Sequence, residues 1–403
     1  MKMNVAIIGS GYVGLITGLC LASQGNNVRC IDLNKLIINK VNSGEPHFYE
    51  KGLKSLLKNQ LETKKFKSFS SLNELDIEVE MIIIAVGTPS DIKGDINLGY
   101  IINSCKLIGQ YLRNSKKHIS VVVKSTVLPG TTDTLIKNIL EKESFKCVGD
   151  FGIGMNPEFL REGSAIEDFM NPDRIIIGFE DQTTKIKLQN LYKNWDCTKM
   201  LVNTRTAEFI KYTNNCFLAL QISATNEIAN LAYEIGNVDI KEIMHGVHLD
   251  KRWSPMIDNK RIKPEILNYL EAGCGFGGSC FPKDIKAIRN LGLKKGLNMK
   301  VLTSIIEVND LQPLKILRMI EEINNFQDMN ILVLGLSFKE NTDDVRESPA
   351  LTIIPKLRNS INKIYLHDPI ARDNFKKELG NFEELQYIKN WESYIKSCHI
   401  ISL

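Results

Sequence analysis

The sequence of 403 residues lacks long basic runs and long uninterrupted apolar segments, and each absence excludes a class of protein. Its 51 basic and 47 acidic residues leave a net charge of +4, so the strong positive surface of a dedicated nucleic-acid binder is missing. The apolar stretch 5–22 contains four glycines, and no cleavage pattern follows it. We therefore expect no nucleic-acid partner, no export and no membrane span.

Closely spaced cysteines are also absent. The nine cysteines lie too far apart for a disulfide scaffold or for paired CxxC metal ligands, which predicts buried, reduced thiols, a cytoplasmic protein and no metal site. Hydrophobic residues make up 43% of the chain and charged residues 24%, a composition that is typical of globular proteins. At this length we expect two or three domains.

Short β-rich runs alternate with helical stretches in the first half of the chain, which predicts an α/β fold with a Rossmann-like, doubly wound, largely parallel sheet. The expected strands are 4–8, 27–31, 80–86, 118–123, 151–155 and 174–178, and the expected helices are 12–23, 98–112 and 131–140. After residue 313 a helix leads to a second, smaller Rossmann-like domain, with expected strands at 330–334 and 363–367 and a helix at 350–357.

Between these halves, residues 205–235 contain no proline or interior glycine, and Gly236 follows them as a helix C-cap would. This pattern predicts a long central helix between domains. The mostly helical segment after it is interrupted at 250–264 and at 273–279, where we expect substrate-facing loops. The predicted domains are 1–203, 204–312 and 313–403.

A glycine motif, Gly9-Ser10-Gly11-Tyr12-Val13-Gly14, lies between the first expected strand and helix. Such a turn lets a pyrophosphate approach the backbone at a helix N-terminus. Asp32 follows the second strand, where a carboxylate accepts hydrogen bonds from a ribose and repels a 2′-phosphate, which favours NAD over NADP. A turn that only packs, and an acidic residue that only begins a loop, are the alternative interpretations.

Two more loops end expected strands, at the sheet edge where ligands bind in α/β folds. They contain Thr88, in the run 85–89, and Thr126, in the run 124–127. Both are candidates for the cofactor side. Each is equally compatible with an ordinary loop whose hydroxyl caps a helix.

The densest chemical signal is the run 275–284, in which Cys280 stands on a glycine-rich turn before an expected helix and Asp284 follows four residues later. A helix N-terminus lowers the pKa of a thiol and favours a thiolate nucleophile. A buried, inert thiol is the alternative.

On the long helix, Lys211 and Asn215 are four residues apart and share a face, so an ammonium and an amide can meet one oxyanion. A solvated helix face is the alternative for this pair. Glu158 and Glu162, in the run 156–163, are either carboxylates with perturbed pKa values or the charged start of a helix.

Taken in order, these motifs resemble the nucleotide-sugar 6-dehydrogenases, the superfamily of UDP-glucose and GDP-mannose 6-dehydrogenases. The landmarks span nearly the whole chain: GSGYVG at 9, AVGTPS at 85, KSTVLPGT at 124, NPEFLREGSA at 156, AEFIKYTNN at 207, GFGGSCFPKD at 275 and LGLSFKENTDDVRES at 334. The resemblance implies a four-electron oxidation of a sugar C6 alcohol to a carboxylate with two NAD+ in succession. UDP-glucose is the preferred substrate, with GDP-mannose and UDP-N-acetyl sugars as alternatives.

By this resemblance, Cys280 traps the aldehyde as a thiohemiacetal, and a second hydride transfer leaves a thioester that water hydrolyses. Lys211 and Asn215 stabilise the oxyanion, Asp284 and Thr126 position water, and Glu158 is the general acid/base. The residues assigned to the cofactor are Gly9, Gly11, Tyr12, Val13, Gly14, Asp32, Lys35, Thr88, Thr126, Glu162 and Arg346. The residues assigned to the substrate are Glu158, Phe159, Leu160, Lys211, Asn215, Arg261, Tyr269, Gly277, Phe281 and Lys339.

The resemblance also implies a homodimer that packs through the long helix, with an arginine of one subunit reaching the sugar in the other. Arg261 is favoured over Arg252 because its spacing to Cys280 is nearer that of the family. Glu271 stands where several relatives have a basic or neutral residue, and its carboxylate would repel phosphate unless it points elsewhere or binds a sugar hydroxyl.

The chain stops within an expected strand of the third domain, where relatives continue, so we expect that domain to be shortened at its C-terminus. Because the third domain is expected to be shortened, one alternative function is a dimer that binds NAD but does not catalyse the reaction. A simple two-electron hydroxy-acid dehydrogenase is a further alternative, although it would leave Cys280 without a role.

Overall fold

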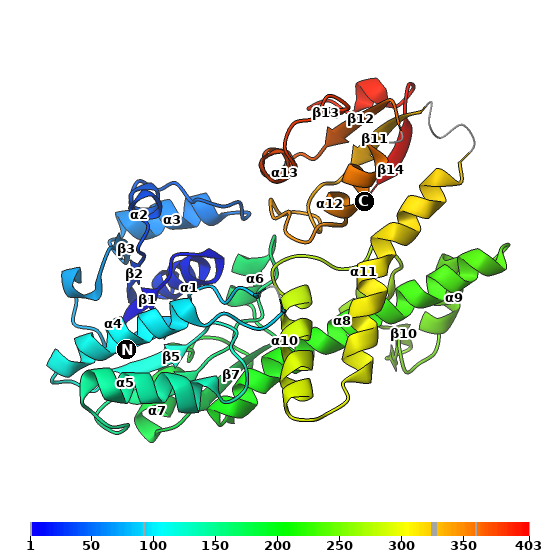
Figure 1. Ribbon diagram of the computed structural model, residues 1–403. Coiled ribbons are helices and arrows are strands. Elements are labelled where there is room, and N and C mark those ends of the chain that lie inside the picture. Colours follow the sequence, from blue (N-terminus) through cyan, green and yellow to red (C-terminus); the bar gives the residue numbers. More distant parts are fainter. Residues whose placement is uncertain (1, 92, 324–328, 359–360, 403) are drawn as a thin grey trace. The chain divides into compact units, whose positions relative to one another are not determined.

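The structure is a computed structural model that describes residues 2–91, 93–323, 329–358 and 361–402. The chain divides into two compact units, Met1–Thr213 and Asn214–Leu403. The division falls inside helix α8 (Thr204–Ile235), which is continuous (Figure 1). The predicted domain boundaries at 203/204 and 312/313 stay predictions.

The first unit contains an eight-stranded sheet with the order β3-β2-β1-β4-β5-β6-β7-β8. Its strands are β1 (Asn4–Ile8), β2 (Asn27–Ile31), β3 (Phe66–Phe69), β4 (Met81–Ile84), β5 (Ser120–Val123), β6 (Gly152–Met155), β7 (Arg174–Phe179) and β8 (Thr198–Val202). Every pair is parallel except β6–β7, which is antiparallel. The doubly wound α/β fold is therefore confirmed, and the prediction of a largely parallel sheet holds with this one exception.

Side chains of β1 alternate between the two faces of this sheet. Val5 and Ile7 belong to one apolar core, which includes residues of α1, α3, α6 and α7, whereas Ala6 and Ile8 belong to a second, which includes residues of α4 and α5. The helices of the unit, with a π-helical turn η2, are α1 (Tyr12–Ser23), α2 (Lys35–Asn42), α3 (Leu53–Glu62), η1 (Leu72–Glu74), α4 (Gly99–Asn114), η2 (Thr131–Ile136), α5 (Lys137–Ser144), α6 (Ala165–Met170) and α7 (Gln182–Leu191). Two-sided burial explains why the central strands β1, β4 and β5 are almost wholly apolar.

The second unit begins with a helical part that follows α8. Its elements are α9 (Ile240–His248), β9 (Met256–Ile257), β10 (Lys260–Arg261), η3 (Glu265–Leu270), α10 (Phe281–Lys294) and α11 (Lys300–Glu321). The predicted C-cap is confirmed, because Gly236 has a φ of 73° and donates its N–H to Ala232 O. The helix expected after residue 313 was placed too late, since α11 runs through Pro313 from residue 300.

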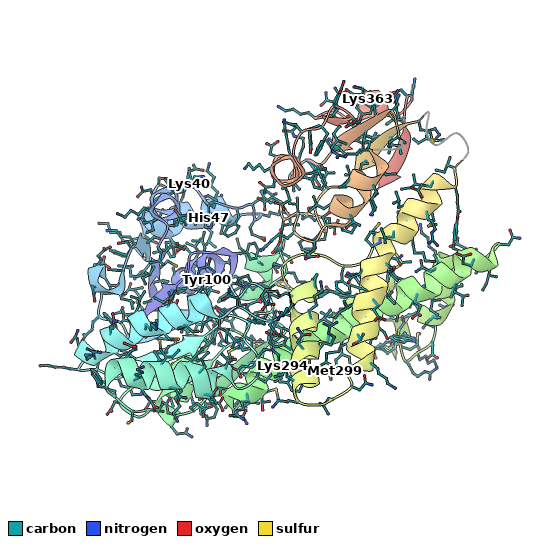
Figure 2. The ribbon with its side chains drawn as sticks, viewed as in Figure 1. Lys40, His47, Tyr100, Lys294, Met299 and Lys363 are labelled. Carbon is teal, nitrogen blue, oxygen red and sulfur yellow. The ribbon has the colours of Figure 1, made fainter. Side chains whose placement is uncertain are left out.

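Helices α8, α10 and α11 share a small core of Ala219, Phe276, Ile285, Ile305 and Ile306. Lys294 ends α10 and Met299 directly precedes α11, as the labels in Figure 2 show. This short connection allows the two helices to pack together.

A four-stranded parallel sheet with the order β13-β12-β11-β14 forms the last part of the chain. Its elements are β11 (Asn330–Leu334), α12 (Pro349–Leu357), β12 (Lys363–His367), α13 (Arg372–Leu379), β13 (Leu385–Tyr387), η5 (Glu392–Tyr394) and β14 (His399–Ser402). The predicted strands 330–334 and 363–367 and the predicted helix are confirmed. The last described residues form β14, which pairs with β11.

Candidate active site

The glycine motif forms the turn between β1 and α1. Gly9 has a φ of 102°, and a Cβ at Gly14 would lie 2.0 Å from the carbonyl oxygen of Gly9. Packing alone therefore accounts for these two glycines. A Cβ at Gly11 would meet nothing within 4 Å, although Gly11 is the N-cap of α1. Packing of the turn therefore does not explain the glycine at position 11. The open space at this helix N-terminus is where a pyrophosphate would bind.

Asp32 lies directly beside this turn. Its Oδ2 accepts a hydrogen bond from Ser10 N at 2.8 Å, and its Oδ1 accepts one from Asn34 N at 2.9 Å. The carboxylate is thus oriented by backbone groups of the glycine turn and of the loop before α2, which Lys35 begins. The carboxylate thus lies beside the turn that contains Gly11, a position that suits a hydrogen bond to the ribose of a bound dinucleotide.

Tyr12 connects α1 to the loop that follows β6. Its hydroxyl donates to Glu50 Oε2 at 2.5 Å, and the same buried carboxylate accepts from Gly163 N at 2.8 Å and Ala165 N at 3.0 Å. Burial raises the pKa of Tyr12, and the charges of Glu50 and Glu162 raise it further. The hydroxyl is therefore a structural donor to Glu50, while the neighbouring Val13 packs against the core.

The two loops assigned to the cofactor side lie together. Thr88 Oγ1 donates to Thr126 O at 3.0 Å, and Ser125 Oγ donates to Val86 O at 2.7 Å. The loops that follow β4 and β5 are therefore joined directly, at the same sheet edge as the glycine turn.

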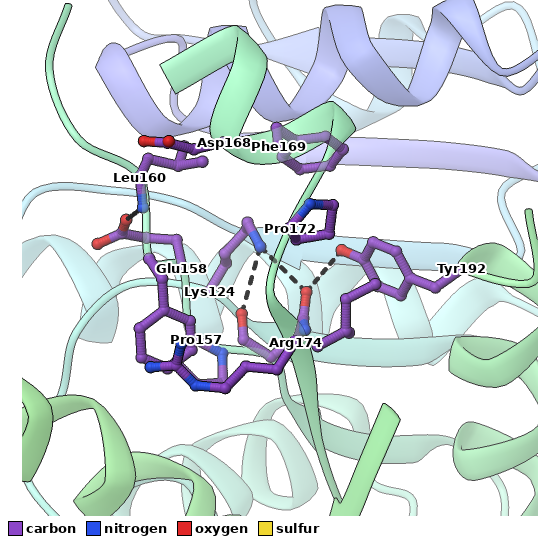
Figure 3. Close-up of a pocket in the computed structure, with 12 residues that line it drawn as sticks. Lys124, Pro157, Glu158, Leu160, Asp168, Phe169, Pro172, Arg174 and Tyr192 are labelled. Carbon is purple, nitrogen blue, oxygen red and sulfur yellow. Dashed lines mark hydrogen bonds between the residues drawn. The ribbon is translucent and has the colours of Figure 1, made fainter. Parts of the chain in front are cut away.

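Glu158 is buried and forms an ion pair with Lys211 of α8, whose Nζ lies 2.9 Å from Oε1 (Figure 3 labels Glu158). Its Oε2 accepts from Leu160 N at 2.7 Å. Burial alone would raise the pKa of Glu158, but Lys211, the Leu160 N–H and Lys124 together lower it below its usual value. Because it is an ionised, buried carboxylate outside any helix, the helix-start interpretation of Glu158 is wrong.

Phe159 lies beside the same ion pair. The guanidinium of Arg174 is 4.2 Å from the centre of its ring, and the ammonium of Lys211 is 5.3 Å from it. The aromatic ring is therefore in contact with two cations of the first unit.

In the second unit, Cys280 is the N-cap of α10, and its half-buried sulfur lies 3.6 Å from Ser279 Oγ. Asp284, one turn later, is buried and accepts from Asn215 Nδ2 at 2.7 Å and from Lys283 Nζ at 2.5 Å. Three residues that the sequence assigned to chemistry, Cys280, Asn215 and Asp284, therefore come together in one unit. The solvated-face interpretation of Asn215 is wrong, because Asn215 is buried.

The glycines before Cys280 pack against the segment that follows β11. A Cβ at Gly277 would lie 2.2 Å from Glu347 O, and Gly278 N donates to Arg346 O at 2.9 Å. This close backbone approach requires a glycine at 277 whether or not the residue also meets a substrate. The cysteine loop and the LGLSFKENTDDVRES segment are therefore one structural feature.

Comparison with known proteins covers all of these motifs. Residues 3–196 match the NAD binding domain of the UDP-glucose/GDP-mannose dehydrogenase family, residues 205–311 match its central domain, and residues 332–403 match its UDP binding domain. The chain belongs to the UDP-glucose/GDP-mannose dehydrogenase family. It is accordingly an NAD-dependent oxidoreductase whose C-terminal domain is of the UDP-binding type.

Relatives in this family resemble the chain over nearly its full length. UDP-glucose 6-dehydrogenase of Rickettsia typhi is 38% identical over 407 residues, covering 100% of this chain and 88% of the relative. The solved UDP-glucose dehydrogenase of the archaeon Pyrobaculum islandicum has a TM-score of 0.91 at 36% identity, covering 100% of this chain and 90% of that one. GDP-mannose dehydrogenase of Pseudomonas aeruginosa has a TM-score of 0.61 at 30% identity, covering 100% and 96%. The resemblance inferred from the motifs is confirmed.

Both arginines considered for the substrate lie between α9 and η3, Arg252 in a turn and Arg261 in β10. Arg261 Nη1 donates to Leu249 O at 2.8 Å and to Ser254 O at 3.1 Å. Arg252 forms an ion pair with Asp250, with Nη2 and Oδ2 2.5 Å apart. The choice of Arg261 over Arg252 stays a prediction.

The remaining substrate and cofactor assignments stay predictions as well. Tyr269 lies in η3 and exposed Glu271 follows it, while Phe281 packs against Phe276 with ring centres 5.9 Å apart. In the UDP-binding part, Lys339 Nζ lies 5.9 Å from the ring centre of the preceding phenylalanine.

Arg346 forms a bidentate ion pair with Asp344, with Nε–Oδ1 at 2.8 Å and Nη2–Oδ2 at 2.6 Å. The carbonyl oxygen of Arg346 itself accepts the Gly278 N–H that joins this segment to the cysteine loop.

Several buried polar residues that hold the assigned motifs in place were missed by sequence reasoning. Lys124 and Glu208 stand inside quoted motifs, so motif membership was the available signal, whereas Glu50 and Tyr192 carry no local signal. Glu208 is fully buried, and its carboxylate accepts from Gly130 N at 2.6 Å and Thr132 N at 2.8 Å.

No helix within the described ranges is long and apolar enough to cross a membrane. The same residues contain no group of three or more histidine, cysteine, aspartate or glutamate side chains arranged around a metal position.

Proposed function

We propose that the protein oxidises UDP-glucose to UDP-glucuronate in two successive NAD-dependent steps, with the intermediate held covalently on Cys280. The observation that carries this proposal is the second-unit cluster, in which a half-buried thiol at a helix N-terminus stands one turn before the buried Asp284–Asn215 pair. A dehydrogenase that stops at an aldehyde needs no such thiol. The named UDP-glucose 6-dehydrogenases among its relatives support the choice of sugar.

In the first oxidation, the C6 hydroxyl gives up its proton and a hydride leaves C6. NAD, when bound at the glycine turn, accepts one hydride in each of the two oxidations. Glu158 is the proposed base, because its pKa is lowered and it is a carboxylate at neutral pH. Lys211, its ion-pair partner, stabilises the alkoxide that forms on the oxygen.

The Cys280 sulfur then adds to the aldehyde carbon and forms a thiohemiacetal, whose oxyanion is stabilised by Lys211 and by the Asn215 amide. A primary amide has two N–H donors, so Asn215 can hold Asp284 and donate to the substrate as well. Loss of the second hydride leaves a thioester.

Asp284 and Thr126 orient a water molecule, which attacks the thioester carbon. Asp284 takes the proton of this water. The C–S bond then breaks and returns Cys280 as the thiolate. One alcohol, two NAD+ and one water thus give one carboxylate, two NADH and three protons.

The test is the number of NADH molecules formed per limiting sugar nucleotide. With UDP-glucose we expect two from the wild type and no completed second oxidation from Cys280→Ser. Cys274→Ser is the matched control, since its half-buried thiol lies in the same loop six residues earlier. GDP-mannose, UDP-N-acetylglucosamine and UDP-N-acetylmannosamine test the substrate. One NADH and free aldehyde from the wild type would contradict the mechanism, and NADH from none of the four would contradict the function.

We also propose that the protein is a homodimer that packs through α8 and that Arg261 of one subunit serves the substrate of the other. Six large hydrophobic side chains of α8 are exposed in the single chain, and their burial would stabilise association: Phe209, Phe217, Ile228, Leu231, Tyr233 and Ile235. The wide spacing of the nine cysteines supports the predicted cytoplasmic location.

A further inference from the structure

Lys124 is a buried cation that the reaction scheme above does not use. It follows β5, and its side chain is almost wholly enclosed, with 4% of the residue exposed. Its Nζ donates to Asn156 Oδ1 at 3.0 Å and to Asn156 O at 3.4 Å, and it lies 5.7 Å from the ring centre of Phe169. Figure 3 labels Lys124 and draws these two hydrogen bonds of its ammonium as dashed lines. Both acceptors are neutral, so the burial of this charge is costly to the fold.

Asn156 is itself held rigidly, and it begins the loop that carries Glu158. Its Oδ1 also accepts from Tyr192 OH at 2.6 Å, its Nδ2 donates to Ile176 O at 2.8 Å, and its N donates to Val123 O at 2.8 Å. Since Glu158 is only two residues further along, the lysine that is bonded to Asn156 fixes the start of that loop.

The charge of Lys124 also acts on Glu158. The largest stabilising effect on the Glu158 carboxylate comes from Lys211, and the ammonium of Lys124 adds to it. In return, burial lowers the pKa of Lys124 to about 8, an effect that Glu158 opposes and Lys211 reinforces. Two cations and one carboxylate therefore share one buried region.

That region borders a cavity of about 50 Å³. The other titratable or charged side chains that line the cavity are Glu158, Asp168, Arg174 and Tyr192. Asp168 is engaged by Arg161, Arg174 stacks on Phe159, and Tyr192 is neutral because burial raises its pKa. Lys124 is thus the cation on the Asn156 side of Glu158, and Lys211 is the cation on the α8 side.

We propose that Lys124 is a positioning residue for the dehydrogenation, which fixes the Asn156–Leu160 loop and holds Glu158 in its ionised form beside Lys211. The inference rests on the proposed function only in giving Glu158 the role of base. The alternative is a lysine that only packs in this region. The two roles differ in one result, because removal of the charge alone changes the pKa of Glu158 only if Lys124 is a positioning residue.

Lys124→Gln keeps a neutral N–H donor for Asn156 and removes the charge, whereas Lys124→Arg keeps the charge at every accessible pH. Lys187→Gln is the matched control, because Lys187 is also partly buried in the first unit and its Nζ bonds to neutral oxygens, His118 O at 2.7 Å and Glu80 O at 3.1 Å.

The first readout is the acidic limb of the pH profile of kcat/KM, with UDP-glucose and saturating NAD. A neighbouring cation lowers the pKa of a carboxyl by about one to three units, so we expect Lys124→Gln to move this limb upward by about one pH unit. Lys124→Arg and Lys187→Gln should leave it within experimental error of the wild type, and KM for NAD should stay within about twofold in all variants. An unchanged limb in an active Lys124→Gln protein would overturn the proposal.

The second readout needs no activity. Carbon-13 NMR of glutamate-labelled protein follows the Glu158 carboxyl through a pH titration, and its signal is identified by its loss in Glu158→Gln. The titration midpoint should rise in Lys124→Gln and not in Lys187→Gln, and equal midpoints would refute the inference. An inactive wild type would count against the proposed function, whereas the NMR result decides the role of Lys124 in either case.

Discussion

Substituting Gly14 and Gly11 separately distinguishes packing from cofactor binding in the glycine turn. A Cβ at Gly14 would lie 2.0 Å from Gly9 O and 3.0 Å from Gly9 C, and contacts under 3.0 Å require something to shift. The obstructing atoms are backbone, so α1 or the turn must move by about 1 Å. Overpacking costs about 1–3 kcal/mol in ordinary cores, and we expect Gly14→Ala to cost about 3 kcal/mol because no flexible side chain yields.

For a compact unit of this size, 1 kcal/mol lowers the melting temperature by about 2–4 °C, so Gly14→Ala should lower Tm by about 6–12 °C. Gly11→Ala should leave it nearly unchanged, since Gly11 has a φ of −65° that alanine adopts and its Cβ would meet nothing within 4 Å. The added methyl group instead occupies the space where a pyrophosphate would approach. Loss of one hydrogen bond to a charged group costs about 1.5–3 kcal/mol, which is about tenfold or more in NAD affinity.

The assay is thermal unfolding without ligand, followed by near-ultraviolet circular dichroism, together with NAD titration calorimetry at a temperature where every variant is folded. A Gly14→Ala protein that melts with the wild type would refute the packing argument. A Gly11→Ala protein that binds NAD with wild-type affinity would show that the open space at α1 is not the pyrophosphate position.

Two further predictions concern a buried carboxylate and the dimer. Burial raises the pKa of Glu208 to about 7, although hydrogen bonds from Thr132 and Gly130 oppose the rise. Because the folded pKa exceeds the unfolded one, its stabilising contribution is complete below about pH 4.5 and is lost as pH rises through about 7. The urea midpoint of the wild type, measured relative to that of Glu208→Gln, should therefore be higher at pH 5 than at pH 8. A difference between the two midpoints that does not change with pH would contradict this. Mixing inactive Arg261→Ala with inactive Cys280→Ser should restore up to about a quarter of the activity after subunit exchange if Arg261 acts across the dimer, and none if it acts within its own chain.

The local elements of the fold could be predicted because their signals are local. The ranges 4–8, 12–23 and 27–31 match β1, α1 and β2 residue for residue, since apolar runs bounded by glycine or polar residues define them. The antiparallel pairing of β6 with β7 could not be predicted, because alternation of strands and helices favours parallel neighbours throughout a sheet. The continuation of α11 through Pro313 was missed because a proline is locally a helix breaker, and burial of Pro313 against neighbouring elements outweighs that preference.

The sequence by itself determined the family and the NAD-binding domain, and it predicted Cys280 as the reactive thiol, because these depend on residue types at fixed spacing in short segments. Only the tertiary structure decided which charges meet. It joins Glu158 to Lys211 across 53 positions, Glu50 to the loop at 163–165, and Asn215 to Asp284 across 69 positions. Contacts at such separations arise from the packing of whole elements, and the burial that this packing produces sets which carboxylates are ionised.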